Sequence, residues 1–453
     1  MLCAPQTNST TSNPRGNSAI NANDTLAPQD LPASPTARLW RNRGFNILWA
    51  GQSLSAVGDS FALVALPLLV LQATGSVAQM GLVTGVNGVG GIIAGIFAGV
   101  IADRFDRRRL MILCDWSRFA LYGVIPLWWA LFGPAFWVIY VVVLLTSLFG
   151  MTFSVAYMTA INHLVEPDQF TYANARLQST AAIANVIGPL LAGVISARFG
   201  PVAAIGADAL TFAMSAASLM FIQMRKRDQP HASGEIESRM RELSAGLRFL
   251  WSDPTLRAMT WLNAIVSFLV GGALNLIIFH IKHDLAQNDS AVGLTLAIAS
   301  IGAAIGAVIA PWLRRRFGFG PTWIPGLAIC GLSIALSGPS PTIAFVAFCA
   351  AGFTAGDAVI SVSQISLRQE FTPNYLLGRV TAAFWTTLFV PMSIGAAVSA
   401  GIAQHIGAPT TLASLGVGVV LMAVIGLFTP IRTRRPSLRI LEEAPVDAPI
   451  TAA

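Results

Sequence analysis

The feature that most limits how this chain can fold is a series of twelve long apolar runs. Each run is long enough to cross the roughly 30 Å hydrocarbon core of a bilayer as a helix, in which every backbone polar group is bonded inside its own segment. We therefore predict twelve membrane-spanning helices. Their approximate limits are 45–72, 77–101, 110–132, 135–158, 173–196, 201–223, 258–280, 291–313, 320–338, 341–364, 380–403 and 409–429.

The composition supports this interpretation. Only 11% of the residues are charged and 54% are hydrophobic, and the mean hydropathy is +0.65. A soluble globular protein carries about 25% charged residues. The composition excludes a disordered chain, a disulfide-rich secreted scaffold and a free nucleic-acid binder, so no nucleic acid is expected as a partner.

Arginine clusters between the apolar runs predict the topology. They flank both ends of the apolar region and occupy the second-to-third connection, the middle linker and the eighth-to-ninth connection. The opposite set of loops carries little more than Arg198 and Lys282. By the positive-inside rule both termini are cytoplasmic, and the even number of spans agrees.

The polar stretch in the middle of the chain divides the spans into two sets of six. Residues 240–251 within it are expected to form an amphipathic helix, which lies on the inner membrane surface or packs on the protein's own cytoplasmic face. The predicted organisation is a disordered cytoplasmic tail (1–42), an N-terminal six-helix bundle (43–223), a cytoplasmic linker (224–257), a C-terminal six-helix bundle (258–430) and a second cytoplasmic tail (431–453).

The strongest local motif ends the second span and reads Gly99-Val-Ile-Ala-Asp103-Arg104-Phe-Asp106-Arg107-Arg108. It resembles the loop signature of the major facilitator superfamily, G-x-L-A-D-R-x-G-R-[KR], and departs from it at Asp106, where glycine is preferred. The resemblance implies an all-α polytopic membrane protein, with twelve transmembrane helices in two six-helix halves.

In that family the motif acts as a cytoplasmic latch in the outward-facing state. The resemblance places Asp103 near the start of the eleventh span, around Gly378 and Arg379, where the helix dipole favours a carboxylate. Gly99 allows close helix approach, and Arg104 and Arg107 pair with nearby acids. The alternative is plain positive-inside topology with incidental acids. The predicted latch residues are Gly99, Asp103, Arg104, Arg107 and Arg108.

A second motif lies in the fifth span. Gly188-Pro189-Leu-Leu-Ala192-Gly193 resembles the antiporter signature G-P-x-x-G-G, with alanine in place of one glycine. That signature is found in exporters. Proline removes a helix hydrogen bond and small residues let helices approach, so an ordinary packing kink is the alternative.

Ionisable residues inside the apolar runs are functional candidates, because burying a charge in a membrane is costly. Asp59, Asp208 and Asp357 are candidates for binding a proton or substrate, or for structural hydrogen bonding. Asp115 and Arg118 are three residues apart on one helix face, so we predict a gating ion pair. The fourth span lacks the intramembrane arginine of many proton-coupled members of the superfamily.

Two further patterns are relevant to transport. Glycines recur along the second span from Gly81 to Gly99 and in the eighth span at Gly302 and Gly306. They predict either sliding seams between the two halves or static packing of the helices. Phe384, Trp385 and Phe389 could line a drug-sized cavity or face the membrane. No phosphate-binding loop, metal spacing or catalytic motif is present in the sequence, so neither an enzyme nor a cofactor or metal site is expected.

The branch of the superfamily that contains macrolide-efflux and enterobactin-exporter proteins is the one most similar. The similarity rests on Gly58-Asp59-Ser60, Val165-Glu166-Pro167-Asp168-Gln169 and Leu377-Gly378-Arg379-Val380. It implies a monomer in the bacterial plasma membrane that exports a small hydrophobic or amphipathic compound, a drug, macrolide or siderophore-like molecule, by alternating access and proton antiport. An importer or facilitator, and a non-transporting membrane sensor, are the alternatives.

Overall fold

The computed structural model describes residues 35–222, 244, 246–372 and 376–434. Its regular elements are helices. In chain order they are α1 (Pro35–Arg41), α2 (Arg43–Thr74), α3 (Val77–Arg104), α4 (Arg107–Phe132), α5 (Phe136–Leu164), the short turn η1 (Pro167–Gln169), α6 (Phe170–Phe199), α7 (Pro201–Met220), α9 (Pro254–Val270), α10 (Ala273–Phe279), the π-helical turn η2 (His280–Asp284), α11 (Asp289–Phe317), α12 (Gly320–Ser337), α13 (Ile343–Phe371), α14 (Leu377–Ile406), α15 (Ala408–Leu427) and η3 (Pro430–Arg432).

Twelve of the described segments are long and apolar enough to span a membrane, which confirms the predicted number. The seventh span differs from the expected single helix over 258–280. It consists of α9, α10 and η2, with a break at Gly271 and Gly272. A Cβ at Gly271 would lie 2.1 Å from the Met392 carbonyl oxygen. Glycine therefore permits close contact between this break and α14.

Local sequence signals set several helix boundaries. The Asn42 side chain accepts a hydrogen bond from the Phe45 amide at the start of α2, and the Asp106 side chain accepts one from the Arg109 amide at the start of α4. Such caps satisfy amides that have no partner within the helix. Asp106, the departure from the superfamily signature, therefore has a structural explanation as an N-cap.

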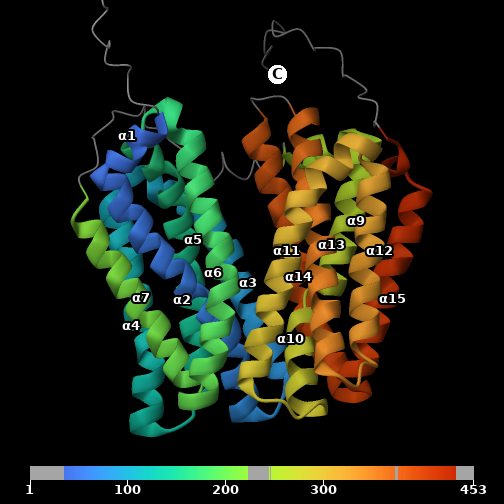
Figure 1. The fold of residues 1–453 in the computed structure, drawn as a ribbon, viewed down its shortest axis with the longest axis horizontal. Helices are drawn as coiled ribbons and strands as arrows, with labels where there is room; N and C mark the ends of the chain where they lie inside the picture. Colours follow the sequence, from blue (N-terminus) through green and yellow to red (C-terminus); the bar gives the residue numbers. More distant parts are fainter. Residues whose placement is uncertain (1–34, 223–243, 245, 373–375, 435–453) are drawn as a thin grey trace, which may run out of the picture.

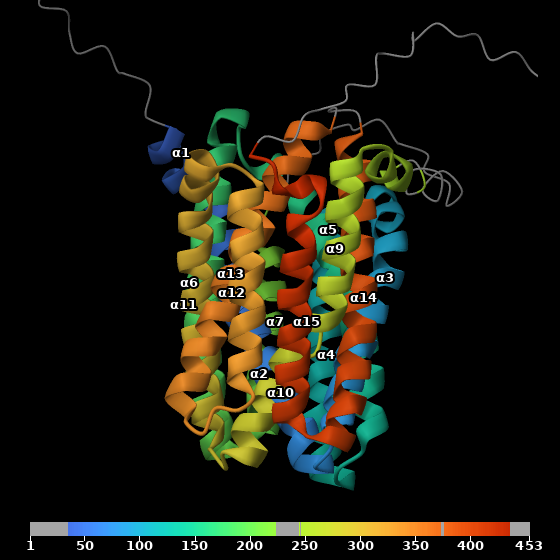
Figure 2. The ribbon, with the colours of Figure 1, turned by 90° about the vertical axis from the view of Figure 1, so that its right-hand side faces the viewer.

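The helices form two bundles that stand side by side in Figure 1, and in Figure 2 the C-terminal bundle lies in front of the N-terminal one. Helices α2 to α7 form the N-terminal half and α9 to α15 form the C-terminal half. We define the basic end as the end of the molecule where α2 and α4 begin and α11 ends, near Arg107–Arg109 and Arg314–Arg316. The far end of both bundles is called the opposite end.

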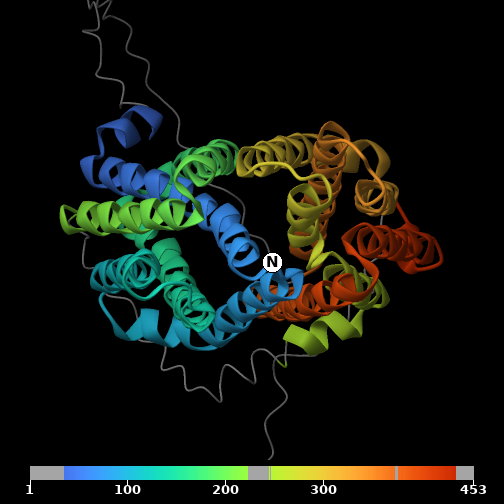
Figure 3. The same ribbon diagram turned by 90° about the horizontal axis from the view of Figure 1, so that it is seen from below.

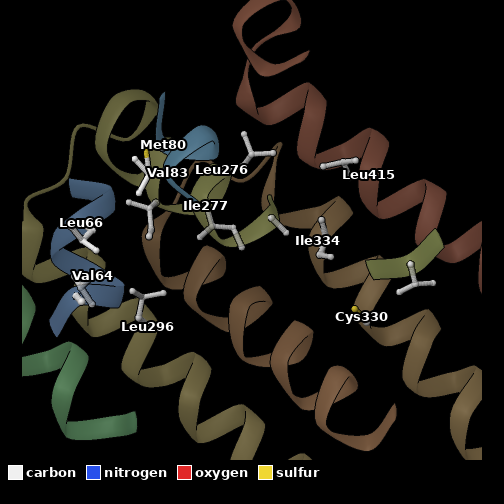
Figure 4. Close-up of a cluster of buried hydrophobic side chains, with 14 of the residues drawn as sticks. Val64, Leu66, Met80, Val83, Leu276, Ile277, Leu296, Cys330, Ile334 and Leu415 are labelled. Carbon is white, nitrogen blue, oxygen red and sulfur yellow. The ribbon is translucent and has the colours of Figure 1, made fainter. Parts of the chain in front are cut away.

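The two halves contact each other near the opposite end. Figure 3 shows two neighbouring pairs of helices, α6 beside α11 and α3 beside α14. Among the described residues, three hydrogen bonds cross between the halves there: Gln72 to Asp289 (3.0 Å), Asn275 to Thr84 (2.6 Å) and Gln404 to Ser76 (2.8 Å). Figure 4 adds an apolar contact region, in which Met80 and Val83 of α3 lie close to Leu276 and Ile277 of α10.

Glycines bring the backbones together at this contact. A Cβ at Gly193 of α6 would lie 2.8 Å from the Cα atom of Gly293 in α11, and a Cβ at Gly81 would lie 2.5 Å from the Ala396 carbonyl oxygen. Gly95 lies on the same face of α3 as Gly81, yet a Cβ there would have only Met151 of the same half within 4 Å. The contact between α3 and α14 therefore ends before the basic end, where the ribbons diverge in Figure 1.

The glycines of the eighth span have a different role from the predicted seam. A Cβ at Gly302 would lie 2.2 Å from the Ala351 carbonyl oxygen, and one at Gly306 would lie 2.3 Å from that of Ala355. Both alanines belong to α13, which is in the same half. The prediction of an inter-half seam is therefore wrong for Gly302 and Gly306, and these residues pack α11 statically against α13.

The middle linker lies mostly outside the described residues, as do residues 1–34 and 435–453, so the predicted tails are not described. Residues 246–251 of the predicted amphipathic helix are helical, and the helix continues to residue 252. A Cβ at Gly246 would lie 2.3 Å from the Arg379 carbonyl oxygen, and Leu250 is fully buried. This part of the linker therefore packs on α14, which supports the alternative of a helix on the protein's own face.

The crossing of α6 and α11 yields a test of how the halves close. Gly193→Ala places a methyl group against the backbone of α11, so the opposite end should open. The measurement is cross-linking of the pair Ser76→Cys and Gln404→Cys, in a Cys3→Ser background because Cys114, Cys330 and Cys349 are buried. We expect cross-linking to slow by about fivefold, because a tight small-residue crossing tolerates no added atom.

Gly91→Ala is the matched control, because a Cβ at Gly91 would have nothing within 4 Å. It should leave the cross-linking rate unchanged. Equal rates for Gly193→Ala and the parent would contradict the structural role of this crossing.

Candidate transport site

An ion pair lies inside the N-terminal half. A guanidinium nitrogen of Arg118 on α4 lies 2.5 Å from a carboxylate oxygen of Asp59 on α2. The Arg118 side chain is 12% exposed and that of Asp59 is 51% exposed. The guanidinium carbon also lies 3.7 Å from the ring centroid of Phe212 on α7, and Gly150 of α5 leaves room beside it. Three helices therefore position Arg118 toward Asp59.

The predicted gating pair of Asp115 and Arg118 is not formed among the described residues. Arg118 pairs with Asp59 on another helix. The Asp115 side chain, one turn earlier on α4, turns toward α7 and accepts a hydrogen bond of 2.6 Å from the Ser215 hydroxyl. The spacing of three residues is consistent with an ion pair on one helix, but tertiary contacts give each side chain a different partner.

Ser215 links Asp115 to α2. Its hydroxyl oxygen accepts a hydrogen bond of 2.9 Å from the Gln52 side-chain amide while the hydroxyl donates to Asp115. Asp115 is fully buried, and its second carboxylate oxygen has no hydrogen-bond partner. Sequence analysis missed Gln52 and Ser215. Their signal is weak, because an uncharged polar residue in an apolar run is common in membrane helices.

Asp208 is the third acid of this region. It is fully buried on α7, and Thr211 donates to one of its carboxylate oxygens at 3.4 Å. The other oxygen has no hydrogen-bond partner. A Cβ at Gly58 would lie 2.6 Å from the Asp208 carboxylate, so the residue before Asp59 packs directly against Asp208. We call Asp59, Asp115, Arg118 and Asp208 the N-half acid cluster.

Asp357 lies apart from this cluster. It is on α13 in the C-terminal half, its side chain is exposed, and it makes no hydrogen bond or ion pair with another described residue. The structure thus brings Asp59 and Asp208 together and leaves Asp357 across the space between the halves.

The loop motif is only partly described. The surroundings of Gly99 and the side chains of Asp103 and Arg104 lie outside the described residues, and Arg107 has an interaction partner. Arg108 donates to the carbonyl oxygens of Leu219, at 2.9 Å, and Met220, at 2.5 Å. These carbonyls end α7, where a cation is favoured by the helix dipole. Arg108 therefore ties α4 to α7, and the latch stays a prediction.

The antiporter-like motif connects the acid cluster with the contact between the halves. A Cβ at Gly188 would lie 2.3 Å from the Cβ atom of Ser60, the neighbour of Asp59. Five residues further along α6, Gly193 meets Gly293 of the other half. A change in the packing of α6 therefore reaches both places.

Asp289 belongs to the contact at the opposite end, and sequence analysis did not single it out. It is almost fully buried, and its carboxylate lies 2.6 Å from the Lys282 ammonium while it accepts from Gln72 of the other half. Asp289 lies in the first turn of α11, where acids are common, so its position in the sequence did not indicate a special role.

Twelve spans in two halves, with a cluster of acids inside the N-terminal half, are typical of a multi-pass membrane protein of the secondary-transporter type. The sequence profile of the Major Facilitator Superfamily matches residues 48–390 and, in a second match, 260–452. The chain belongs to this superfamily. It is therefore a membrane-embedded transporter of small molecules and not an enzyme.

Two relatives are named as exporters. The chain is 26% identical over 430 residues to the multidrug efflux pump Tap of Mycobacterium tuberculosis. This alignment covers 91% of this chain and 99% of that protein. It is 24% identical over 398 residues to the enterobactin exporter EntS of Escherichia coli. That alignment covers 86% of this chain and 92% of that protein.

Solved structures confirm the fold. The nucleoside transporter NupG superposes with a TM-score of 0.69 at 12% identity, over 85% of this chain and 98% of that one. A D-xylose–proton symporter superposes with a TM-score of 0.67 at 14% identity, over 87% of this chain and 99% of that one. At such low identity the likeness shows the fold alone.

The acid cluster predicts unequal effects for two neighbouring serines. Ser215→Ala removes the hydroxyl that bonds Asp115 and leaves a buried carboxyl group without a partner, so we expect a loss of about 1–3 kcal/mol in unfolding free energy. In the control Ser218→Ala the lost hydroxyl bonds only the Ser215 carbonyl, and the loss should stay below about 0.5 kcal/mol. Denaturant unfolding in detergent measures both. Similar losses of unfolding free energy in the two variants would show that the Ser215–Asp115 hydrogen bond stabilises the protein no more than the Ser218 hydroxyl does.

Proposed function

We propose that this protein exports a small hydrophobic or amphipathic compound, such as a drug, macrolide or siderophore-like molecule, from a bacterial cell. The N-half acid cluster is the observation on which the proposal rests, because it places three carboxyl groups around one guanidinium inside the membrane region. The names of the two relatives, a multidrug efflux pump and an enterobactin exporter, support the direction and the substrate class.

The arginine distribution supports an orientation in the plasma membrane with the basic end and both termini in the cytoplasm. With that orientation, the arrangement of the helices corresponds to an inward-facing state, because the halves contact each other at the opposite end and diverge at the basic end. Alternating access would then proceed by rocking of the halves. The contacts of Gly193 with Gly293 and of Gln72 with Asp289 would break in the outward-facing state.

We infer that the acid cluster couples transport to protons. A proton on Asp59 would neutralise the partner of Arg118, and the buried guanidinium would then need another acid. Asp115 lies one turn away on α4, and Asp208 lies one turn from Phe212, the ring that Arg118 contacts. Exchange of partners by Arg118 would shift α2 relative to α4 and α7. Because α2 packs on Gly188 of α6, this shift would reach the contact between the halves.

The latch prediction fits this cycle. Asp103, Arg104 and Arg107 would close the basic end in the outward-facing state, whereas Arg108 already bonds α7. Of the candidate acids, Asp59 is the half-exposed one in the N-terminal half, so it is assigned the exchange of protons with the aqueous space. Asp208 is assigned the role of an alternative partner for Arg118.

The test uses everted membrane vesicles that contain the protein, with dequenching of a proton-gradient dye as the signal. Hydrophobic antibiotics, dyes and siderophores are added in turn. We expect a substrate of the wild type to trigger proton release, and Asp59→Asn to reduce the rate by about tenfold or more, because removal of a coupling acid abolishes the proton-bearing step.

Asp253→Asn is the matched control. Asp253 caps α9 by accepting from the Thr255 and Leu256 amides, and asparagine caps a helix about equally well, so transport should be unchanged. Full pH-dependent transport by Asp59→Asn would remove it as the coupling residue. Substrate accumulation driven in the import direction would contradict export.

A further inference from the structure

Arg368 is a buried cation that has no acid partner among the described residues. It lies on α13, three residues before the helix ends at the basic end, and is 4% exposed. Its guanidinium carbon lies 3.5 Å from the ring centroid of Phe384 on α14. Its Nε and one terminal nitrogen are buried and donate no hydrogen bond. Sequence analysis passed over Arg368 because it resembles the other arginines near the basic end.

The acids on the same helix do not neutralise it. Glu370 pairs with Arg314 of α11 at 2.6 Å. Asp357 is eleven residues earlier, which is about 16 Å along a helix that rises 1.5 Å per residue. Among the described residues Arg368 forms no ion pair. A buried charge without a counter-ion is strongly unfavourable, and ionisable residues in membrane helices usually have a functional role.

Arg368 belongs to a polar face of α13 that points into the C-terminal half. Asp357, Ser361, Gln364 and Arg368 follow one another at intervals of four, three and four residues, which places them on one helix face. The sides of α13 that contact α11 and α12 carry other residues, Ala351 and Ala355 on one side and Gly356 on the other.

The partners of this polar face come from helices on the inner side of the half. Gln364 donates a hydrogen bond of 2.8 Å to Asn263 of α9, and Arg368 contacts Phe384 of α14. Asp357 and Ser361, nearer the middle of the membrane, are exposed. The polar face of α13 therefore extends from the space between the halves, at Asp357 and Ser361, to the buried guanidinium of Arg368.

An aromatic surface adjoins Arg368 on α14. The rings of Phe384 and Trp385 have centroids 6.4 Å apart, and those of Trp385 and Phe389 stack at 5.2 Å. Trp385 and Phe389 are 40% and 41% exposed. They lie on the face of α14 that continues, at intervals of three and four residues, to Ser393, Ala396 and Ala400. Those residues meet α3 of the other half, so the two exposed rings point to where the halves have separated.

We propose that Arg368, Phe384, Trp385 and Phe389 form a binding site for an aromatic compound that carries an anionic group. The anion, a carboxylate, phenolate or sulfonate, would accept from the free guanidinium donors after the Phe384 ring moves aside, and the aromatic body would stack on Trp385 and Phe389. This inference rests on the proposed export function and specifies its substrate class. The phosphate of a lipid headgroup is a second source of the same anionic chemistry.

The test measures binding rather than transport, so its failure is distinguishable from a failure of the export proposal. The full chain is placed in phosphatidylcholine nanodiscs, and the binding of 2-naphthoate and of uncharged 2-naphthamide is titrated by calorimetry. Arg368→Met removes the charge but keeps most of the volume. We expect it to raise the Kd of naphthoate by about tenfold or more, as for a lost charged hydrogen-bond partner, with the Kd of the amide unchanged.

Arg316→Met is the matched control. Arg316 is an exposed arginine near the same end of the same half, with its guanidinium 5.9 Å from the ring centroid of Phe317. It should bind naphthoate as the wild type does. Arg368→Lys keeps the charge and should retain more affinity for naphthoate than Arg368→Met.

Four outcomes would overturn the proposal: no binding of naphthoate to the wild type, equal affinity for the acid and the amide, wild-type affinity in Arg368→Met, or an equal loss of both ligands in that variant. The last would show a structural role. Nanodiscs that contain phosphatidylglycerol distinguish the two sources. Competition that depends on Arg368 identifies a lipid headgroup at the anion site, and unchanged naphthoate affinity identifies a soluble acid.

Discussion

The membrane interior contains no water that could bond an exposed backbone group, and the architecture of this chain follows from that fact. Each span must satisfy its backbone inside one helix, so the chain is a set of helices whose association depends on side-chain shape and on a few polar groups. Glycine is the means of close approach, at Gly58 against Asp208, at Gly188 against Ser60 and at Gly193 against Gly293. All three contacts involve α2 or α6, which link the acid cluster to the contact between the halves.

The same constraint makes each buried charge informative. Arg118 has one acid partner, Asp59, and has two further acids nearby, whereas Arg368 has none among the described residues. The N-terminal half therefore has an excess of acid, which suits the binding of protons. The C-terminal half has, besides the separate acid Asp357, a buried cation close to exposed aromatic rings, which suits an anionic aromatic substrate. We propose that this asymmetry divides coupling and recognition between the two halves.

The contact at the opposite end is composed of individually weak interactions. It combines glycine crossings with isolated hydrogen bonds, such as Asn275 with Thr84, and with the buried Asp289 between Lys282 and Gln72. Small apolar contacts and single hydrogen bonds each contribute little free energy. In the alternating-access cycle that we propose, such an interface would hold the halves together in one state and separate in the other.

Hydrophobic length and loop signatures are local properties, so the number of spans, their approximate limits, the division into two halves and the family could all be predicted from the amino-acid sequence. It also identified Asp59, Asp208 and Phe384 as residues of interest. Three other findings needed the packed structure: Arg118 pairs with Asp59 and not with Asp115, Gly302 and Gly306 pack within one half, and Arg368 has no acid partner among the described residues. The physical reason is that the partner of a charge or of a glycine is set by the neighbouring helix, which lies far away in the sequence and close by only in the packed bundle.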